Sequence, residues 1–302
     1  MKLLLAVSGG IDSMYMAERA LRGALSDLGV ASGGPSPEFA VAHCNFALRG
    51  AESDGDEQFV REWCSSHDVP LFVQAFDTRE YASGHGISIE MAARELRYAW
   101  FAQLCSSERF DAVAVAHNAD DNAETLMLNL LRGCGARGLR GMSRDSGEFP
   151  HRVLRPLLGV SRAEIRAWME AEGLSWREDS TNTDTAFKRN KLRSKVMPVF
   201  GEINPSYLRT LSADMERVAQ VDDIAEDYYR DAAEVCILPD GAIDLRKVVE
   251  FKHWEYLLFR FTEGRLNADG LLRLKKSVES GRPLGGKVFG PYKVRKGKLR
   301  LI

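Results

Sequence analysis

The sequence predicts an α/β fold in which a doubly wound parallel sheet is followed by a long helix and a small C-terminal α+β domain. Three observations support this prediction. Short apolar runs alternate with amphipathic stretches through the first two thirds of the 302 residues, the pattern of βαβ units with helices on both sheet faces. One long amphipathic pattern follows, and then a mixed, basic segment. The corresponding domains are residues 1–203 for the sheet, 204–233 for the helical linker and 234–302 for the C-terminal domain.

The first predicted strand, residues 3–7, ends abruptly in the small polar loop Ser8-Gly9-Gly10-Ile11-Asp12-Ser13. Apolar residues at helical spacing follow as far as Leu28, so the loop lies at a helix N-terminus, where unpaired N–H groups and the helix dipole bind anions. The glycines let the backbone approach a phosphate, and the serine hydroxyls can donate to it. The loop lacks the spacing and the lysine of a P-loop, and a Gly-rich turn without a ligand is the simpler alternative.

Asp12 needs a separate explanation, because a carboxylate beside a phosphate is repulsive unless a cation bridges the two. Magnesium is the cation that this arrangement suggests, and a role in ordering the loop is the alternative.

The remaining elements continue the alternation. Apolar runs predict three more strands, at residues 39–43, 69–76 and 112–116. Apolar residues at helical spacing predict helices at residues 53–67, 88–107 and 119–132. Ser161 and Glu164 form a capping box that opens a further helix. The C-terminal domain is predicted to contain two helices and a strand-like ending, at residues 245–263, 268–280 and 287–302.

Polar residues collect where the predicted strands end, at the edge of the sheet where open α/β folds bind ligands. His43 and Asn45 follow the second strand and His117 follows the fourth, and for each a ligand contact and a structural hydrogen bond are both open. Asp121 and Glu124 are three residues apart on a predicted helix, so they share a face and form a negative pocket for a cation. Capping of the helix N-terminus is the alternative for this pair.

Basic residues concentrate in three segments. Residues 188–195 contain closely spaced cations that suit an RNA backbone or ATP phosphates, or form a solvated helix face. Residues 271–302 carry ten Lys or Arg against one Glu in a chain of net charge −2, which suits either a polyanion-binding surface or a solvated face. The glycine-rich residues 132–142 carry three arginines and form either a loop near the site or a linker.

Composition narrows the class of protein. Hydrophobic residues make up 45% and charged residues 28%, without an apolar run long enough to cross a membrane, so we expect a cytoplasmic globular protein. The first residues are interpreted as a strand and not as a signal peptide. The five cysteines include no C-x-x-C pair, so neither a disulfide framework nor a zinc site is predicted.

Taken together, these motifs resemble one family, the bacterial tRNA(Ile)-lysidine synthases, which are PP-loop or N-type ATP pyrophosphatases. The pattern at residues 8–13 is shared by all PP-loop enzymes, and the whole series of motifs makes the resemblance specific. The matching segments are residues 8–13, 43–50, 93–98, 117–125, 132–142, 154–158, 178–182 and 189–193. The chain departs from the family pattern at Asn118, Asn122 and Cys134, where His, Gln and Ser or Thr are more common.

The resemblance implies an activity. ATP would adenylate the C2 oxygen of the wobble cytidine of an isoleucine tRNA with a CAU anticodon, and L-lysine would then replace AMP. This modification changes the codon read from AUG to AUA. The implied cofactors are ATP and magnesium, and the implied partners are the tRNA and lysine. No membrane partner is expected. The oligomeric state stays open, with a homodimer as one alternative.

The resemblance and the charge pattern also assign roles to residues. The expected catalytic residues are Asp12, Arg94, Asp121 and Glu124, of which the last two would also bind lysine. The expected ATP-binding residues are Ser8, Gly9, Gly10, Ile11, Asp12, Ser13, His43, Arg97 and His117, with Asp12 as the magnesium ligand. The expected tRNA-binding residues are Arg132, Arg137, Lys188, Arg189, Arg193, Lys293, Arg295, Lys296 and Lys298.

Two other classes of function remain open. Another PP-loop enzyme is one: a tRNA thiolase, for which we would expect paired cysteines, or a small-molecule synthetase, which leaves the basic C-terminal residues unexplained. A nucleotide-binding regulatory protein without catalysis is the other, and it would have no use for Asp121, Glu124 and Arg193.

Overall fold

The computed structural model describes residues 1–30, 37–147, 151–178, 188–280 and 283–302. The motif predicted at residues 178–182 lies outside the described residues except for its first position. The chain divides into two compact units, Met1–Val218 and Ala219–Ile302. The division falls inside the long helix α10 (Tyr207–Cys236). The presence of this helix confirms the amphipathic helix predicted from the sequence. Each unit is described by itself.

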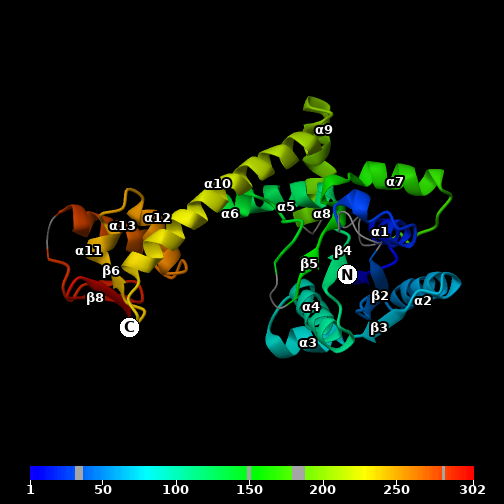
Figure 1. Cartoon of the computed structure of the whole chain (residues 1–302), viewed down its shortest axis with the longest axis horizontal. Coiled ribbons are helices and arrows are strands. Elements are labelled where there is room, and N and C mark those ends of the chain that lie inside the picture. The colour runs from blue at the N-terminus through cyan, green and yellow to red at the C-terminus, as the bar shows by residue number, and fades with distance from the viewer. Residues whose placement is uncertain (31–36, 148–150, 179–187, 281–282) are drawn as a thin grey trace. The chain divides into compact units, whose positions relative to one another are not determined.

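The first unit is built on a five-stranded parallel sheet (Figure 1). Its strands are β1 (Lys2–Ala6), β2 (Glu38–Asn45), β3 (Leu71–Ala75), β4 (Ala112–Val115) and β5 (Val153–Leu154). They lie in the order β3-β2-β1-β4-β5, with Leu4 of β1 between Ala40 and Val113. The predicted parallel sheet is therefore confirmed. The sequence did not predict β5, because an apolar run of two residues is too short to recognise as a strand.

Helices cover both faces of this sheet, as a doubly wound fold requires. The helices described before α10 are α1 (Ile11–Leu21), α2 (Ala51–Ser66), α3 (Thr78–His85), α4 (Ile89–Glu108), α5 (Ala119–Arg132), α6 (Ala136–Leu139), α7 (Arg162–Ala171), α8 (Lys188–Lys195) and α9 (Met197–Ile203). Leu3 and Leu5 belong to a core that includes residues of α1, α2 and α7. Leu4 points to the opposite face and belongs to the core around Phe101 of α4, as expected for alternating side chains on a buried strand.

The strand order reverses at β1, because β2 and β3 lie on one side of it and β4 and β5 on the other. Open α/β sheets bind ligands in the crevice beside the carboxyl ends of the strands at such a reversal. The polar loop at residues 8–13 follows β1, and His117 follows β4. The topology therefore places these two candidate segments at the same crevice.

Three local features of this unit differ from the prediction. The first helix ends at Leu21 and not at Leu28, because Gly23 takes a left-handed conformation with φ of +68°. Only a short 3₁₀ helix, η1 (Ser26–Leu28), follows. The glycine-rich residues 132–142 contain the short helix α6, and α3 is a helix that the sequence did not predict.

The predicted capping box is confirmed at the start of α7. The Ser161 Oγ accepts a hydrogen bond from the Glu164 N–H, and the Glu164 carboxylate accepts one from the Ser161 N–H. A second 3₁₀ helix, η2 (Pro156–Gly159), precedes this cap. The cap sets the position at which α7 begins, and with it the position of Arg162.

The second unit is a small α+β domain, as predicted. Its antiparallel sheet has the order β6-β9-β8-β7, with strands β6 (Ile243–Asp244), β7 (Val288–Phe289), β8 (Tyr292–Arg295) and β9 (Lys298–Leu301). Its short helices are α11 (Leu245–Val248), α12 (Trp254–Phe261) and α13 (Ala268–Glu279). The single helix predicted at 245–263 is wrong. The helix is interrupted between α11 and α12, where Tyr228 of α10 contacts the chain. The Tyr228 hydroxyl accepts a hydrogen bond from the His253 N–H, and its ring packs against Phe251.

Two composition-based predictions can be compared with the structure. The five cysteines are all free thiols. In the described part of the chain, no helix combines the length and the apolar character needed to cross a membrane.

Candidate functional site

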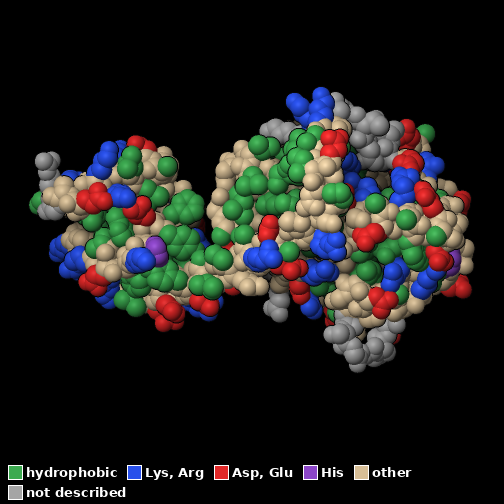
Figure 2. All heavy atoms as spheres, turned by 90° about the horizontal axis from the view of Figure 1, so that it is seen from above, with side chains coloured by type: hydrophobic (Ala, Val, Ile, Leu, Met, Phe, Trp, Pro, Cys, Tyr) green, Lys and Arg blue, Asp and Glu red, His purple; other side chains and the backbone are tan. Residues whose placement is uncertain are grey.

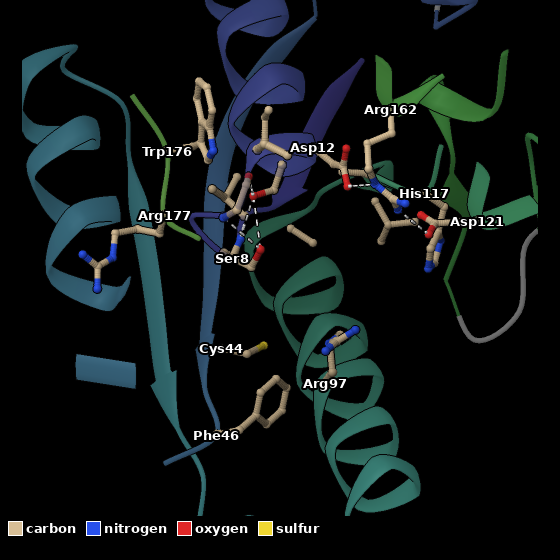
Figure 3. Close-up of a pocket in the computed structure, with 18 of the residues that line it drawn as sticks. Ser8, Asp12, Cys44, Phe46, Arg97, His117, Asp121, Arg162, Trp176 and Arg177 are labelled. Atoms are coloured by element: carbon tan, nitrogen blue, oxygen red, sulfur yellow. Dashed lines mark hydrogen bonds and ion pairs between the residues drawn. The ribbon is translucent and has the colours of Figure 1, made fainter. Parts of the chain in front are cut away.

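A cavity of about 510 Å³ opens at the carboxyl ends of β1, β2 and β4. Loop residues after β1, side chains of α4 and α5, and the start of α7 line it. Figure 3 shows Arg162, His117 and Asp121 grouped on one side of Ser8. Cys44, Phe46 and Arg97 form a second group on another side (Figure 3). The cavity therefore has a charged end and an aromatic end, with the polar loop between them.

The polar loop has a geometry that suits an anion. The Ser13 Oγ donates to the Gly10 carbonyl at 2.8 Å and accepts from the Ser8 N–H at 3.2 Å. Gly9 has φ of +93°, a conformation that favours glycine. Among the described residues, no side chain caps the N-terminus of α1, so the first N–H groups of this helix remain available to an anion.

Three carboxylates and three guanidinium groups form one network at the charged end. Arg162 Nη2 lies 3.1 Å from Asp121 Oδ1, and Arg162 Nε lies 4.0 Å from Asp12 Oδ2. Arg193 contacts Glu124 through two hydrogen bonds, of 2.8 and 3.1 Å. Arg189 lies 3.5 Å from the same carboxylate. The predicted acid pair is thus already matched by cations of the chain itself.

The two acids of the predicted pair occupy different environments. Asp121 lines the cavity and completes a capping box with Asn118 at the start of α5. Glu124 does not line the cavity, and its side chain is only 1% exposed behind Arg193. Of the two carboxylates, Asp121 is therefore the one that a ligand in the cavity can reach.

Several polar atoms around the loop lack a protein partner. Among the described residues, Asp12 Oδ1, His117 Nδ1 and Asn118 Nδ2 are buried without a hydrogen bond. Burial raises the pKa of the Asp12 carboxyl above its ordinary value, with Arg162 acting in the opposite direction. Burial also lowers the pKa of His117 to about 4, so this imidazole is neutral near pH 7. Unpaired buried polar atoms at one crevice are what a polar ligand would satisfy.

The residues at the loop fit a magnesium ion that is shared with a nucleotide. Among the described residues, no group of three or more His, Cys, Asp or Glu side chains could hold a metal without other ligands. Magnesium, however, commonly binds through one or two carboxylates, water and substrate phosphates. The unpaired Oδ1 of Asp12 is suited to such a shared site.

The aromatic end is formed by the exit of β2 and the facing side of α4. The Arg97 guanidinium lies 5.1 Å from the centre of the Phe46 ring. Arg94, one turn away, is exposed and stacks over Tyr98 at 4.9 Å without lining the cavity. Of the two predicted arginines of α4, the structure therefore places Arg97 at the cavity and Arg94 outside it.

The structure places the predicted ATP-binding residues in two groups. Those that line the cavity are Ser8, Gly10, Ile11, Asp12, Ser13, Arg97 and His117. Gly9 and His43 do not line it. The His43 Nδ1 pairs with the Val7 carbonyl at 2.9 Å, so this buried imidazole supports the strand that leads into the loop. Asn45 likewise bonds to acids of α2.

The predicted RNA-binding residues are spread over both units. Arg132 and Arg137 are exposed on α5 and α6, and Lys188 begins α8. In the second unit, the four predicted residues belong to the β8–β9 hairpin, Lys293, Arg295, Lys296 and Lys298. The turn of this hairpin exposes Lys296, which with Gly297 takes positive φ. Figure 2 shows basic side chains interspersed with acidic ones along the outer margin of this unit.

Sequence reasoning missed several contributors to the cavity, among them Arg162 and Trp176. A signal for Arg162 was present, because it is the first residue of α7, where a cation opposes the helix dipole unless acids lie nearby. Trp176 carried no such signal, since an isolated tryptophan after a helix is usually part of a core.

Residues 1–200, which lie within the first unit, match the family model of the PP-loop domain. The tRNA(Ile)-lysidine synthase of Porphyromonas gingivalis is 47% identical over 221 residues, which cover 72% of this chain and 45% of that protein. The tRNA(Ile)-lysidine synthase of Parabacteroides distasonis is 40% identical over 257 residues, which cover 85% of this chain and 55% of that protein. The chain thus spans about half the length of the curated relatives it matches.

A solved structure with a similar fold is the U34-tRNA thiolase NcsA from Methanococcus maripaludis with its [4Fe-4S] cluster. Its TM-score is 0.58 at 18% identity, over 73% of each chain, a similarity that concerns the fold alone. The parallel sheet, the anion-binding loop after β1 and the match over residues 1–200 agree with one another. The chain belongs to the PP-loop domain family.

Proposed function

We propose that this protein joins L-lysine to C2 of the wobble cytidine of an isoleucine tRNA with a CAU anticodon, using ATP and releasing pyrophosphate and AMP. The observation that carries the proposal is the cavity in which the PP-loop faces arginine-paired carboxylates. Relatives named tRNA(Ile)-lysidine synthase match across this cavity at up to 47% identity. The reaction makes the protein a ligase that acts in the cytoplasm.

The first step is adenylation of the tRNA. The C2 oxygen of cytidine attacks the α-phosphorus of ATP, and pyrophosphate leaves. The N–H groups at the start of α1, together with Ser8 and Ser13, hold the phosphates, and Arg162 offsets the charge that develops on them. Magnesium, when bound at Asp12, neutralises phosphate charge and orients the pyrophosphate.

The second step is attack by lysine. The ε-amine forms a bond to C2, and AMP leaves with the former C2 oxygen. A cationic amino group needs a negative partner, and Asp121 is the acid of the predicted pair that lines the cavity. Asp121 therefore positions lysine and can accept a proton from its ε-ammonium group, which leaves the neutral amine that attacks C2. Glu124 acts behind it by holding Arg193 at the cavity wall.

The aromatic end suits a nucleoside base. Phe46 provides an apolar surface and Arg97 a planar cation beside it, a combination on which bases stack. Arg132, Arg137 and the β8–β9 hairpin are our candidates for contacts with tRNA phosphates, which bring affinity without reading sequence.

The oligomeric state is a separate question. Light scattering with and without tRNA tests whether the protein is a monomer or a homodimer.

The test is incorporation of labelled lysine into RNA. The protein is incubated with ATP, magnesium, labelled lysine and total tRNA, and label in tRNA that depends on ATP supports the proposal. Sulfur incorporation in place of lysine would indicate a thiolase, although the sequence has no C-x-x-C pair. ATP cleavage that needs no RNA would indicate a small-molecule synthetase, and ATP binding without turnover a regulatory protein.

A further inference from the structure

A short extended segment lies beside the PP-loop, and the mechanism above does not use it. We call residues 176–178 the strap. The Arg177 N–H donates to the Gly9 carbonyl at 2.9 Å, and Gly10 and Arg177 form a parallel bridge. Trp176, Arg177 and Glu178 all line the cavity. The strap thus forms part of the cavity wall and touches the loop at its two glycines.

The side chain of Arg177 fastens this strap to α2. Figure 3 shows it leading away from Ser8 and Trp176. Its Nε donates to Asp56 Oδ1 at 3.0 Å, while Arg49 Nη2 donates to Asp56 Oδ2 at 2.6 Å. Asp56 is 9% exposed, so its carboxylate is nearly buried with one guanidinium on each oxygen. Charge-assisted hydrogen bonds of this kind are short and directional, and a buried acid without them is costly.

The space around Arg177 is close packed, and Gly55 leaves room for its side chain. Gly55 lies inside α2, where glycine weakens a helix, and a Cβ there would lie 3.1 Å from Arg177 Nη2. At Gly9, a Cβ would contact the Arg177 Cγ at 3.6 Å and the Asp56 carbonyl at 3.7 Å. The loop, the strap and α2 are therefore packed against one another at Arg177.

We infer that Asp56 is a positioning residue for the PP-loop, which it holds through Arg177 and the strap. The inference rests on the proposed ATP site. Loss of the carboxylate frees the Arg177 side chain, loosens the strap and lets residues 8–13 sample conformations in which their N–H groups no longer converge. The cost of reordering the loop is then subtracted from ATP binding.

Two variants test this inference, Asp56→Ala and Arg177→Ala. We measure binding of a non-hydrolysable ATP analogue by calorimetry and amide hydrogen exchange of the peptide that contains residues 8–13. Loss of one charge-assisted bond predicts binding weaker by about tenfold and faster exchange confined to this peptide and the strap. Arg177→Lys, which keeps a cation near Asp56, should restore part of the affinity. Glu62→Gln is the control, because it removes one exposed acid from the same helix outside the cluster.

Each result separates the inference from the proposed function. If Asp56→Ala does not fold, Arg177→Ala decides, because the Arg177 side chain is 43% exposed and Asp56 then keeps Arg49. Unchanged exchange of residues 8–13 in a folded Arg177→Ala protein overturns the inference. Absence of ATP binding by the unmodified protein overturns the proposed function instead, and hydrogen exchange alone then judges the role of Asp56.

Discussion

At the scale of single residues, Asp12 lies at the proposed nucleotide site and carries a cost in stability. Burial raises the pKa of its carboxyl, so the ionised form is less stable in the folded chain than in water. Asp12→Asn keeps the shape without the charge. We expect it to lower AMP formation at least about a hundredfold without lowering the melting temperature. Labelled ATP and thermal unfolding measure the two effects, and a folded variant with near-normal ATP cleavage would remove Asp12 from the mechanism.

His117 predicts a dependence of stability on pH. Its pKa of about 4 in the folded chain is below the ordinary 6.5, so the unfolded chain binds the proton more readily. The folded chain therefore loses stability as the pH falls from 6.5 to 4, by no more than roughly 3 kcal/mol from this residue. His117→Gln should reduce the difference between the free energies of unfolding measured with urea at pH 7 and at pH 4.5.

His85→Gln, a substitution on α3 away from the cavity, serves as the comparison for His117. This variant measures how far the loss of an exposed imidazole by itself changes the pH dependence of unfolding. A His117→Gln protein with the same pH dependence as the unmodified one would mean that the imidazole is not held neutral by burial.

At the scale of elements, α5 carries two acids that lie in different environments. Asp121 faces the cavity, and Glu124 is buried against α8 by its bonds to Arg193. We expect Asp121→Asn to impair lysine transfer more than adenylation, with little loss of stability. Glu124→Gln should impair both steps and lower the free energy of unfolding by roughly 2 kcal/mol, because the half-buried Arg193 guanidinium loses its charged hydrogen-bond partner.

The two half-reactions are measured separately, as formation of adenylated tRNA without lysine and as its conversion when lysine is added. A Glu124→Gln protein that is fully stable and defective only in lysine transfer would return Glu124 to the lysine site. That outcome would also mean that Arg193 keeps its place without the carboxylate.

At the scale of the whole molecule, a tRNA substrate requires binding surface beyond one cavity. Residues 271–302 carry ten cations against one acid. We expect replacement of the four hairpin cations, Lys293, Arg295, Lys296 and Lys298, by Ala to weaken tRNA binding and reduce its salt dependence. The log–log slope should fall by roughly 0.7 to 0.9 for each tRNA phosphate that the variant no longer neutralises, and ATP affinity should not change. Discrimination between tRNAs should persist, since cations that bind phosphates do not read sequence.

Binding is measured at several salt concentrations. The control replaces four cations of the same unit outside residues 271–302, Arg230, Lys247, Lys252 and Arg265, so that the total charge removed is equal. Equal effects of the two sets would show that only net charge matters, and an unchanged slope in the hairpin variant would identify a solvated surface.

Local sequence patterns were enough to predict the parallel sheet, the polar loop at a helix N-terminus and the long helix. These follow from local patterns: apolar runs that must be buried, small residues that fit a helix N-terminus, and one periodic apolar face. The α5 acids were placed on one face for the same reason, since residues three apart on a helix are neighbours. The pattern misled at residues 245–263, where helical spacing continues through a break that contacts with Tyr228 impose.

Which side chains contact one another could be learned only from the folded chain. Asp121 faces the cavity whereas Glu124 is buried because α8, distant in sequence, brings Arg193 against α5. Arg97 reaches the cavity and Arg94 does not, since residues three apart on α4 still differ in direction relative to β2. Asp56, Arg177 and Gly9 come from three separate segments. No local spacing relates such residues, because they meet only after the sheet, the helices and the strap have packed together.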